Sequence, residues 1–259
     1  MKNKNGTYGL CFIVCLLLLL VLPQDAGARN IDVLFFALGG DLEETSGALS
    51  EDLKEVLRFS NDSNVRVLAL VGGSNQWYFP DLKSKHSYLI QIENGNLLDV
   101  SDRGVISLAT VDALSILLEE GQKRFGYEEK ILIFWGHGCH APLGIGSDTV
   151  HDGDVLTLDE IATALNDKGS VYSLIGFDAC DMANQEMILP LKPYTEHILV
   201  CNASESVSGW NYRWISGLND VLSPTEYILQ VCNQTFLHED QDCQLIMLWN
   251  KYSPELVNQ

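Results

Sequence analysis

A histidine and a cysteine each follow a short apolar segment of this chain, and together they could cleave a peptide bond. His137 stands between two glycines after residues 131–135, and Cys180 comes soon after residues 174–177. Catalytic groups collect at the carboxyl ends of strands in open α/β sheets, so we expect the two side chains to face each other across one sheet edge. A cysteine thiolate attacks carbonyl carbons, and a histidine can exchange the protons of that reaction.

The surroundings of the two residues favour this chemistry. The glycines beside His137 allow a sharp turn and leave space for a substrate. We predict a helix that begins at Cys180, where the helix dipole and an imidazolium would favour the thiolate. From the residues alone, a structural histidine and a disulfide-bonded cysteine remain open. His140 and His151 lack the paired spacing of metal ligands, so we expect no metal and no other cofactor.

An α/β fold is expected to position these residues. Short apolar runs predict strands over residues 31–38, 65–71, 88–92, 130–135, 171–177 and 196–201. Apolar residues at helical spacing predict helices around residues 49–57 and 114–125, and Thr157 with Glu160 forms a capping box that opens another helix. This alternation predicts a mostly parallel sheet with helices on both faces. The chain has no repeat or linker, so we expect one domain over residues 29–259.

The first 28 residues have the layout of a cleavable secretory signal. Lys2 and Lys4 precede an apolar run at residues 10–22, which leads to the small residues Ala26, Gly27 and Ala28. The run has 13 residues, fewer than the roughly 18 to 20 that a membrane-spanning helix needs. We therefore expect a secreted, soluble mature chain without stable membrane insertion.

The charge of the chain excludes one class of partner. Its 35 acidic and 16 basic residues give a net charge of −19, whereas contact with phosphates needs clustered Lys and Arg. We expect no binding to nucleic acid or to anionic membranes. The acidic surface either attracts cationic substrates or only keeps a secreted protein soluble, and both possibilities are open.

The cysteines also fit an oxidising compartment. Five of the seven remain after the signal is removed, an odd number that suggests disulfides plus one free thiol. If Cys180 is the free thiol, three pairings are open for the other four, which are Cys139, Cys201, Cys232 and Cys243. The pair 232 with 243 is the first choice because the two are close in sequence. Sequons that fit a secreted glycoprotein stand at Asn61, Asn202 and Asn233.

Several ordered motifs resemble those of the clostripain-like cysteine peptidases, which are caspase-related enzymes. Residues 131–138 and 176–186 (GFDACDMANQE) are similar to the histidine-glycine and aspartate-alanine-cysteine signatures of that family. Further similar segments are 35–44, 107–125, 156–166 and 209–212, so the resemblance covers most of residues 31–220. It implies a caspase-like three-layer sandwich and an activity on peptides or proteins.

The resemblance implies a role for each site residue. Cys180 is the nucleophile, His137 protonates the leaving amine, and the backbone amides of Gly138 and Cys180 hold the oxyanion. No third catalytic side chain is required. Asp178 corresponds to an acid that binds Arg or Lys before the scissile bond in the family. Glu205, in a shortened loop, either replaces a second pocket acid or is an ordinary surface acid.

The chain departs from the family pattern in three places. Cys139 and His140 follow Gly138 where relatives usually have glycines, which makes Cys139 a competing nucleophile or a disulfide partner. Relatives often cut themselves between the His and Cys segments, but the only basic residue there is Lys168, at the end of a predicted helix, so we expect no self-cleavage. The chain stops soon after a predicted last strand at 243–249, so the domain is expected to be C-terminally short.

Three functions remain open. The first is a clostripain-like endopeptidase, which residues 177–182 and the Gly209-Trp210 pair favour over the second, a legumain-like peptidase. The third is a secreted binding module that keeps the caspase-like sheet without activity. Both dyad residues are present, so we favour an active cysteine endopeptidase.

Overall fold

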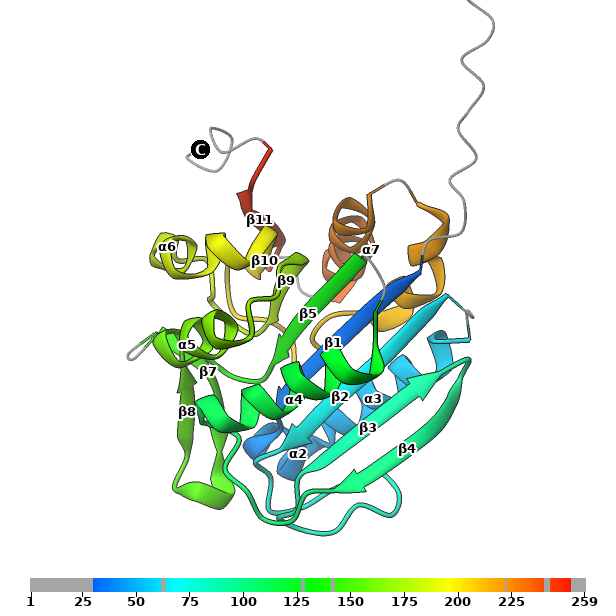
Figure 1. The fold of residues 1–259 in the computed structure, drawn as a ribbon, viewed down its shortest axis with the longest axis vertical. Coiled ribbons are helices and arrows are strands. Elements are labelled where there is room, and N and C mark those ends of the chain that lie inside the picture. Colours follow the sequence, from blue (N-terminus) through cyan, green and yellow to red (C-terminus); the bar gives the residue numbers. More distant parts are fainter. Residues whose placement is uncertain are drawn as a thin grey trace, which may run out of the picture.

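The computed structural model describes residues 30–61, 64–126, 129–140, 143–221, 223–239 and 243–252 (Figure 1). The predicted signal at 1–28 lies outside the described residues. Among the described helices, none is long and apolar enough to span a membrane.

An eight-stranded sheet runs through the molecule in the order β11-β10-β9-β5-β1-β2-β3-β4. Five neighbouring strands are parallel, namely β1 (Ile31–Leu38), β2 (Val65–Gly72), β5 (Glu129–Trp135), β9 (Tyr172–Asp178) and β10 (Thr195–Cys201). Antiparallel strands complete both edges, namely β3 (Tyr88–Glu93), β4 (Asn96–Asp102) and β11 (Leu245–Asn250). All eight residues of β1 are buried, because the central strands are covered on both faces.

Helices pack on both faces of this sheet and bury two separate hydrophobic cores. One core includes α3 (Ala48–Phe59), the 3-10 segment η4 (Tyr212–Asp220) and α7 (Pro224–Glu239). The other includes α4 (Val111–Arg124), α5 (Leu158–Lys168) and α6 (Ile188–Leu191), which lie on the opposite face in Figure 1. The expected three-layer α/β architecture is confirmed.

The predicted strands are confirmed within a few residues, and so are the helices predicted around residues 49–57 and 114–125. Thr157 caps α5 and exchanges hydrogen bonds with Glu160, which is the predicted capping box. The prediction missed β4, although Asn94-Gly95 forms the two-residue hairpin turn that joins it to β3. β4 is a mostly exposed edge strand, so it lacks the continuous apolar run of the central strands.

A second, three-stranded antiparallel sheet was also missed. It contains β6 (Gly138–His140), β7 (Leu143–Asp148) and β8 (Asp154–Thr157), with the short turn η1 (Thr149–His151) between the last two. Together, residues 138–157 form the connection between His137 and the helix α5. We call this connection the β6–β8 segment.

Candidate active site

His137 and Cys180 follow adjacent parallel strands, as predicted. Trp135 at the end of β5 pairs with Asp178 at the end of β9, and the Gly136 amide donates to the Asp178 carbonyl oxygen at 3.2 Å. A Cβ atom added to Gly138 would lie 1.8 Å from the carbonyl oxygen of Cys180. Only glycine fits at this position. The residues that follow His137 can therefore lie directly against the backbone of Cys180.

A carboxylate that the sequence analysis did not assign contacts the histidine. Nε2 of His137 lies 2.8 Å from Oδ1 of Asp41, in the first turn of α2 (Gly40–Ser46). Because α2 follows β1, this carboxylate reaches the same sheet edge as the histidine. It can hold one ring nitrogen and so set the orientation and tautomer of the imidazole.

The predicted helix after Cys180 is wrong. Residues 179–181 form a turn, Asp181 has a left-handed φ of 55°, and the next helical residues are those of η2 (Gln185–Met187). No helix dipole therefore supports the thiolate. Burial raises the pKa of the Cys180 thiol, the Glu205 amide partly opposes this, and the charges of Asp181 and Asp178 add to it.

The segment at residues 202–210 is tied to the cysteine turn by short contacts. The Glu205 amide lies 3.2 Å from Sγ of Cys180, and the Asp181 amide donates to the Ala203 carbonyl oxygen at 2.9 Å. Ser204 Oγ also donates to the Asp181 carboxylate at 3.0 Å. The position of Glu205 is thus coupled to that of the thiol.

Asp178 is buried and holds the end of the 202–210 segment and the nearby Tyr212 in place. Its carboxylate accepts hydrogen bonds from the Trp210 amide at 3.1 Å and from the Tyr212 hydroxyl at 2.6 Å. The Trp210 ring packs against Gly176, where an added Cβ would lie only 2.7 Å from the ring. No helix follows β9 directly, so the Asp178 carboxylate does not cap a helix.

Asp178 and Glu205 form a buried pair of carboxyl groups. Burial raises the pKa of Asp178 to about 6, although hydrogen bonds from Glu205, Tyr212 and Trp210 oppose the rise. Burial and the charge of the neighbouring Asp178 also raise the pKa of Glu205 well above its usual value. The carboxyl group of Glu205 therefore does not have the solvated setting of an ordinary surface acid.

A third carboxyl group, Asp52, joins this pair from α3. It is 5% exposed, and its Oδ2 accepts a hydrogen bond from the Trp135 indole at 2.7 Å. Burial and the charge of Asp178 raise its pKa. The sequence contained a signal for it, because an acid stands among Leu49, Leu53 and Val56 on the apolar face of the helix.

A cavity of about 300 Å³ lies between α3 and the 202–210 segment. The helix side carries acids and bases together, including Asp52, Glu55, Lys54 and Arg58, and Val207 and Ser208 line the other side. The cavity is large enough for an extended side chain.

The structure also shows the surroundings of His151 and of most of the cysteines. Nδ1 of His151 lies 3.0 Å from Asp148. Four of the described cysteines are thiols in the structure, namely Cys180, Cys201, Cys232 and Cys243. The disulfide between Cys232 and Cys243, the first choice from the sequence, is therefore not formed in it. The side chains of Cys139 and His140 lie outside what the structure describes.

Comparisons with known proteins agree on one family. The profile of the clostripain family (Peptidase_C11) matches residues 40–244. The comparison with curated proteins gives no match. Among solved structures, a secreted C11 cysteine protease from Bacteroides thetaiotaomicron, in complex with an irreversible peptide inhibitor, has 18% identity and a TM-score of 0.67.

Two further solved structures share the fold. The secreted C11 protease "iotapain" from B. thetaiotaomicron has 14% identity and a TM-score of 0.64, and an inactive zymogen C11 protease from Parabacteroides distasonis has 16% and 0.59. The alignments cover 83%, 83% and 81% of this chain but only 63%, 64% and 59% of those chains. Because the family profile spans most of the residues that build the sheet, the chain belongs to the clostripain family of cysteine peptidases.

Proposed function

We propose that this protein is a secreted cysteine endopeptidase that cleaves after Arg or Lys with a His137–Cys180 dyad. The observation that carries the proposal is the buried group of acids beside the cysteine, namely Asp178, Glu205 and Asp52. The largest influences on the pKa values of these three acids are burial, neighbouring acids and hydrogen bonds. None of these influences comes from a Lys or Arg side chain. A cationic substrate side chain would supply the missing positive charge.

The dyad performs the chemistry in two stages. Sγ of Cys180 attacks the scissile carbonyl carbon after its proton passes to His137, and backbone amides of Gly138 and Cys180 stabilise the oxyanion. His137 then gives the proton to the leaving amine. In the second stage His137 deprotonates a water molecule, which attacks the thioester and releases the acid product.

Asp41 supports His137 in both stages. Its carboxylate, 2.8 Å from Nε2, orients the ring and favours the imidazolium that forms when the thiol loses its proton. The raised pKa of Cys180 in the free protein means that this proton transfer needs such help.

The specificity follows from the acids. An Arg side chain can bind a carboxylate through two parallel hydrogen bonds, whereas Lys binds as a point charge, so Arg should be preferred. The net charge of −19 would raise the local concentration of cationic peptides, and the cleavage rate should fall with added salt.

Export of the protein is inferred from residues 1–28 together with the family. Two of the similar structures are described as secreted C11 proteases, and a cleavable signal would direct this chain to the same route. Peptides or proteins outside the cell would then be its partners.

The test is a panel of peptides that differ only in the residue before the scissile bond, with Arg, Lys, Ala and Asn compared. We expect cleavage in the order Arg, Lys, then the neutral residues, and no cleavage by Cys180→Ala. Asp178→Asn should lower kcat/KM on the Arg peptide about 100-fold, because a buried cation loses its partner. Asp167→Asn, an exposed acid on α5, is the matched control.

Two outcomes would reject parts of the proposal. Equal cleavage after Ala and Arg would remove the basic specificity while leaving the dyad in place. A folded wild type that cleaves none of the peptides but binds them would support the inactive binding module instead.

A further inference from the structure

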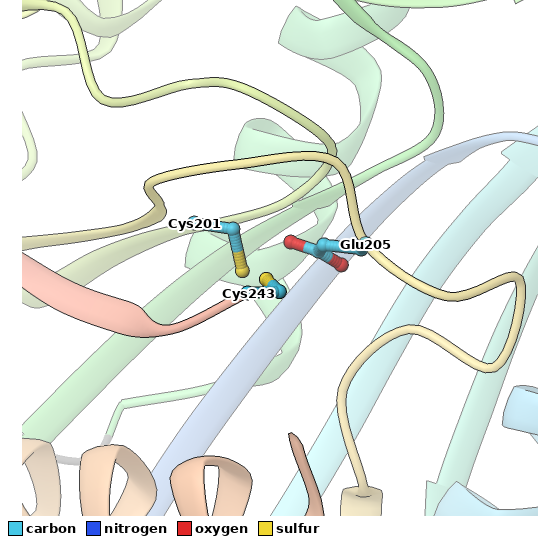
Figure 2. Close-up of side chains that lie close together, drawn as sticks. All are labelled: Cys201, Glu205 and Cys243. Atoms are coloured by element: carbon cyan, nitrogen blue, oxygen red, sulfur yellow. The ribbon is translucent and has the colours of Figure 1, made fainter. Parts of the chain in front are cut away.

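Two buried cysteines lie together beside the candidate active site. Cys201 is the last residue of β10, and Cys243 precedes the edge strand β11, so both lie where these two paired strands meet. They are 0% and 2% exposed, and their sulfur atoms and a carboxylate oxygen of Glu205 lie within 4.8 Å of one another. Figure 2 shows the two sulfur atoms side by side, with the Glu205 carboxyl group next to them.

The backbone holds these two cysteines in place. The Asn202 amide donates to the Gln244 carbonyl oxygen at 3.1 Å, and the Gln244 amide donates to the Asn202 side chain at 2.9 Å. These bonds join the residue after Cys201 to the residue after Cys243, and the strand ladder continues them. The two thiols are close enough for a hydrogen bond to each other. Cys232 lies on α7 and interacts instead with the Asn211 backbone.

We propose that Cys201 and Cys243 form a disulfide in the exported protein. The oxidant is a low-molecular-weight disulfide such as glutathione disulfide. One thiolate attacks it and releases one glutathione, and the second thiolate attacks the mixed disulfide and releases the other. Two protein thiols become one S–S bond, and two glutathione thiols are produced.

The crosslink has two consequences for the site, and these rest on the proposed function. It links the two ends of the chain stretch that runs from β10 through the 202–210 segment and α7 to β11. This link holds Glu205, which lies in that stretch, near Cys180. It also removes the two thiols of Cys201 and Cys243 as competitors of Cys180.

The test is disulfide mapping of the secreted protein after digestion at glutamate. Cleavage after Glu129, Glu160, Glu186, Glu196, Glu205, Glu226, Glu239 and Glu255 puts each mature-chain cysteine in its own peptide. Free thiols are blocked with N-ethylmaleimide, and glycans on Asn202 are removed first. We expect residues 197–205 linked to residues 240–255, with the Cys180 peptide alkylated.

Other mapping results would overturn the proposal. A link from residues 240–255 to the Cys232 peptide at 227–239, or to the Cys139 peptide at 130–160, assigns a different pair. Alkylation of both Cys201 and Cys243 after equilibration with glutathione disulfide shows that no bond forms. Zinc in the purified protein, with both thiols alkylated only after a chelator, makes the cluster a metal site instead. None of these readouts depends on peptidase activity, so they stand apart from the proposed function.

Thermal unfolding gives an independent measurement. Dithiothreitol should lower the Tm of the wild type by about 10 °C, because reduction releases the constraint on the unfolded chain. The Cys201→Ala/Cys243→Ala variant should lose this response, and Cys232→Ala, which removes another buried thiol, should keep it. A response retained by the double variant would contradict the proposal, and mapping of the wild type decides the matter if that variant fails to fold.

Discussion

The contact between Asp41 and His137 has the most direct consequence at the scale of single residues. The Asp41 carboxylate contacts Nε2 of His137, and both side chains are partly exposed. An exposed pair is worth less than a buried one, so Asp41 should tune the dyad without being essential to it.

We predict that Asp41→Asn lowers kcat/KM about tenfold, since an amide can favour the wrong tautomer and does not stabilise the imidazolium. The measurement is steady-state kinetics on the Arg peptide, with the alkylation rate of Cys180 as a second readout. Asp167→Asn should leave both unchanged. Full activity of Asp41→Asn would show that the contact is incidental.

The raised pKa of Cys180 predicts the pH dependence of its alkylation. Burial favours the neutral thiol, so the reactive thiolate should be scarce at pH 7 and increase up to and beyond pH 9. Iodoacetamide should nevertheless modify Cys180 before Cys201, Cys232 and Cys243, which are buried, and His137→Ala should slow the reaction. A rate that stays constant from pH 6 to 8 would instead indicate a preformed thiolate–imidazolium pair.

The raised pKa of Asp178 predicts that the free protein loses stability as the pH rises. The unfolded carboxyl has a pKa of about 3.9, against about 6 in the fold, so the folded state binds the proton more tightly. This stabilisation is complete below about pH 4 and is lost as the pH rises through about 6, a change of about 3 kcal/mol. Glu205 and Asp52 act in the same direction.

Thermal unfolding between pH 5 and pH 7.5 tests this prediction. The wild type should have the higher Tm at pH 5, and Asp178→Asn should reduce the difference because its amide does not titrate. Equal slopes for the two proteins would mean that Asp178 is already ionised and compensated in the fold.

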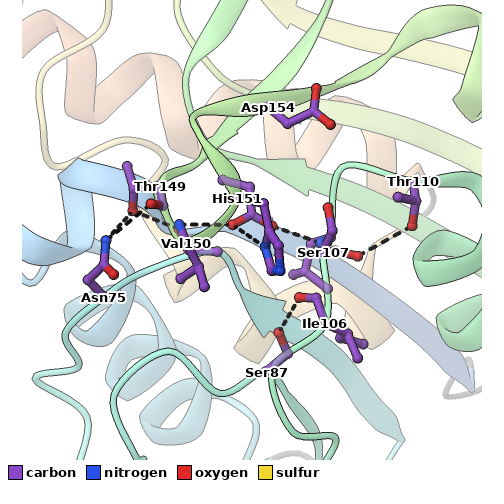
Figure 3. Close-up of polar contacts among 12 residues, drawn as sticks. Asn75, Ser87, Ile106, Ser107, Thr110, Thr149, Val150, His151 and Asp154 are labelled. Carbon is purple, nitrogen blue, oxygen red and sulfur yellow. Dashed lines mark hydrogen bonds and ion pairs between the residues drawn. The ribbon is translucent and has the colours of Figure 1, made fainter.

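At the scale of elements, the turn at residues 148–151 of the β6–β8 segment is hydrogen-bonded to the rest of the molecule. Figure 3 shows this turn in contact with two other loops. Asn75 donates to the Thr149 carbonyl oxygen at 3.2 Å, and buried Asp148 accepts from the Leu108 amide at 2.9 Å and from the Val150 amide at 3.1 Å. A peptidase would have to detach this turn before cutting it.

The chain should therefore stay intact between Gly138 and Asp178 during its own activity. Lys168, the basic residue in that interval, ends α5 and pairs with Glu119 at 2.7 Å. Helical, paired residues fit poorly into an extended active-site groove. Intact mass after prolonged incubation of the active protein measures this, with Cys180→Ala as the control. A fragment ending at Lys168 in the wild type alone would contradict it.

At the scale of the whole molecule, the start of the mature chain can be predicted from the fold and the signal together. Ile31 opens β1 and is fully buried, so cleavage after Ala28 would leave the central strand complete. Amino-terminal sequencing of secreted protein should read Arg29-Asn30-Ile31. A membrane-retained product that keeps Lys2 would show that the apolar run at residues 10–22 acts as an anchor.

The sequence by itself determined the central parallel strands, most of the helices that cover them, and the places of His137 and Cys180 after two of those strands. Runs of buried residues and helical spacing report which face of an element is covered, and His137 and Cys180 follow two such runs directly. The capping box at Thr157 is equally local. What the sequence did not determine are interactions that join distant segments.

The tertiary structure decided the surroundings of the pair. Asp41 and His137 are 96 positions apart, and Asp52 reaches Asp178 only because α3 packs on the face of the sheet to which that carboxylate points. The helix expected at Cys180 failed because Asp181 adopts a left-handed conformation that a helix cannot contain. Periodicity describes burial along one element, whereas the charge and the pKa of a site depend on which polar groups from different elements meet, and packing alone settles that.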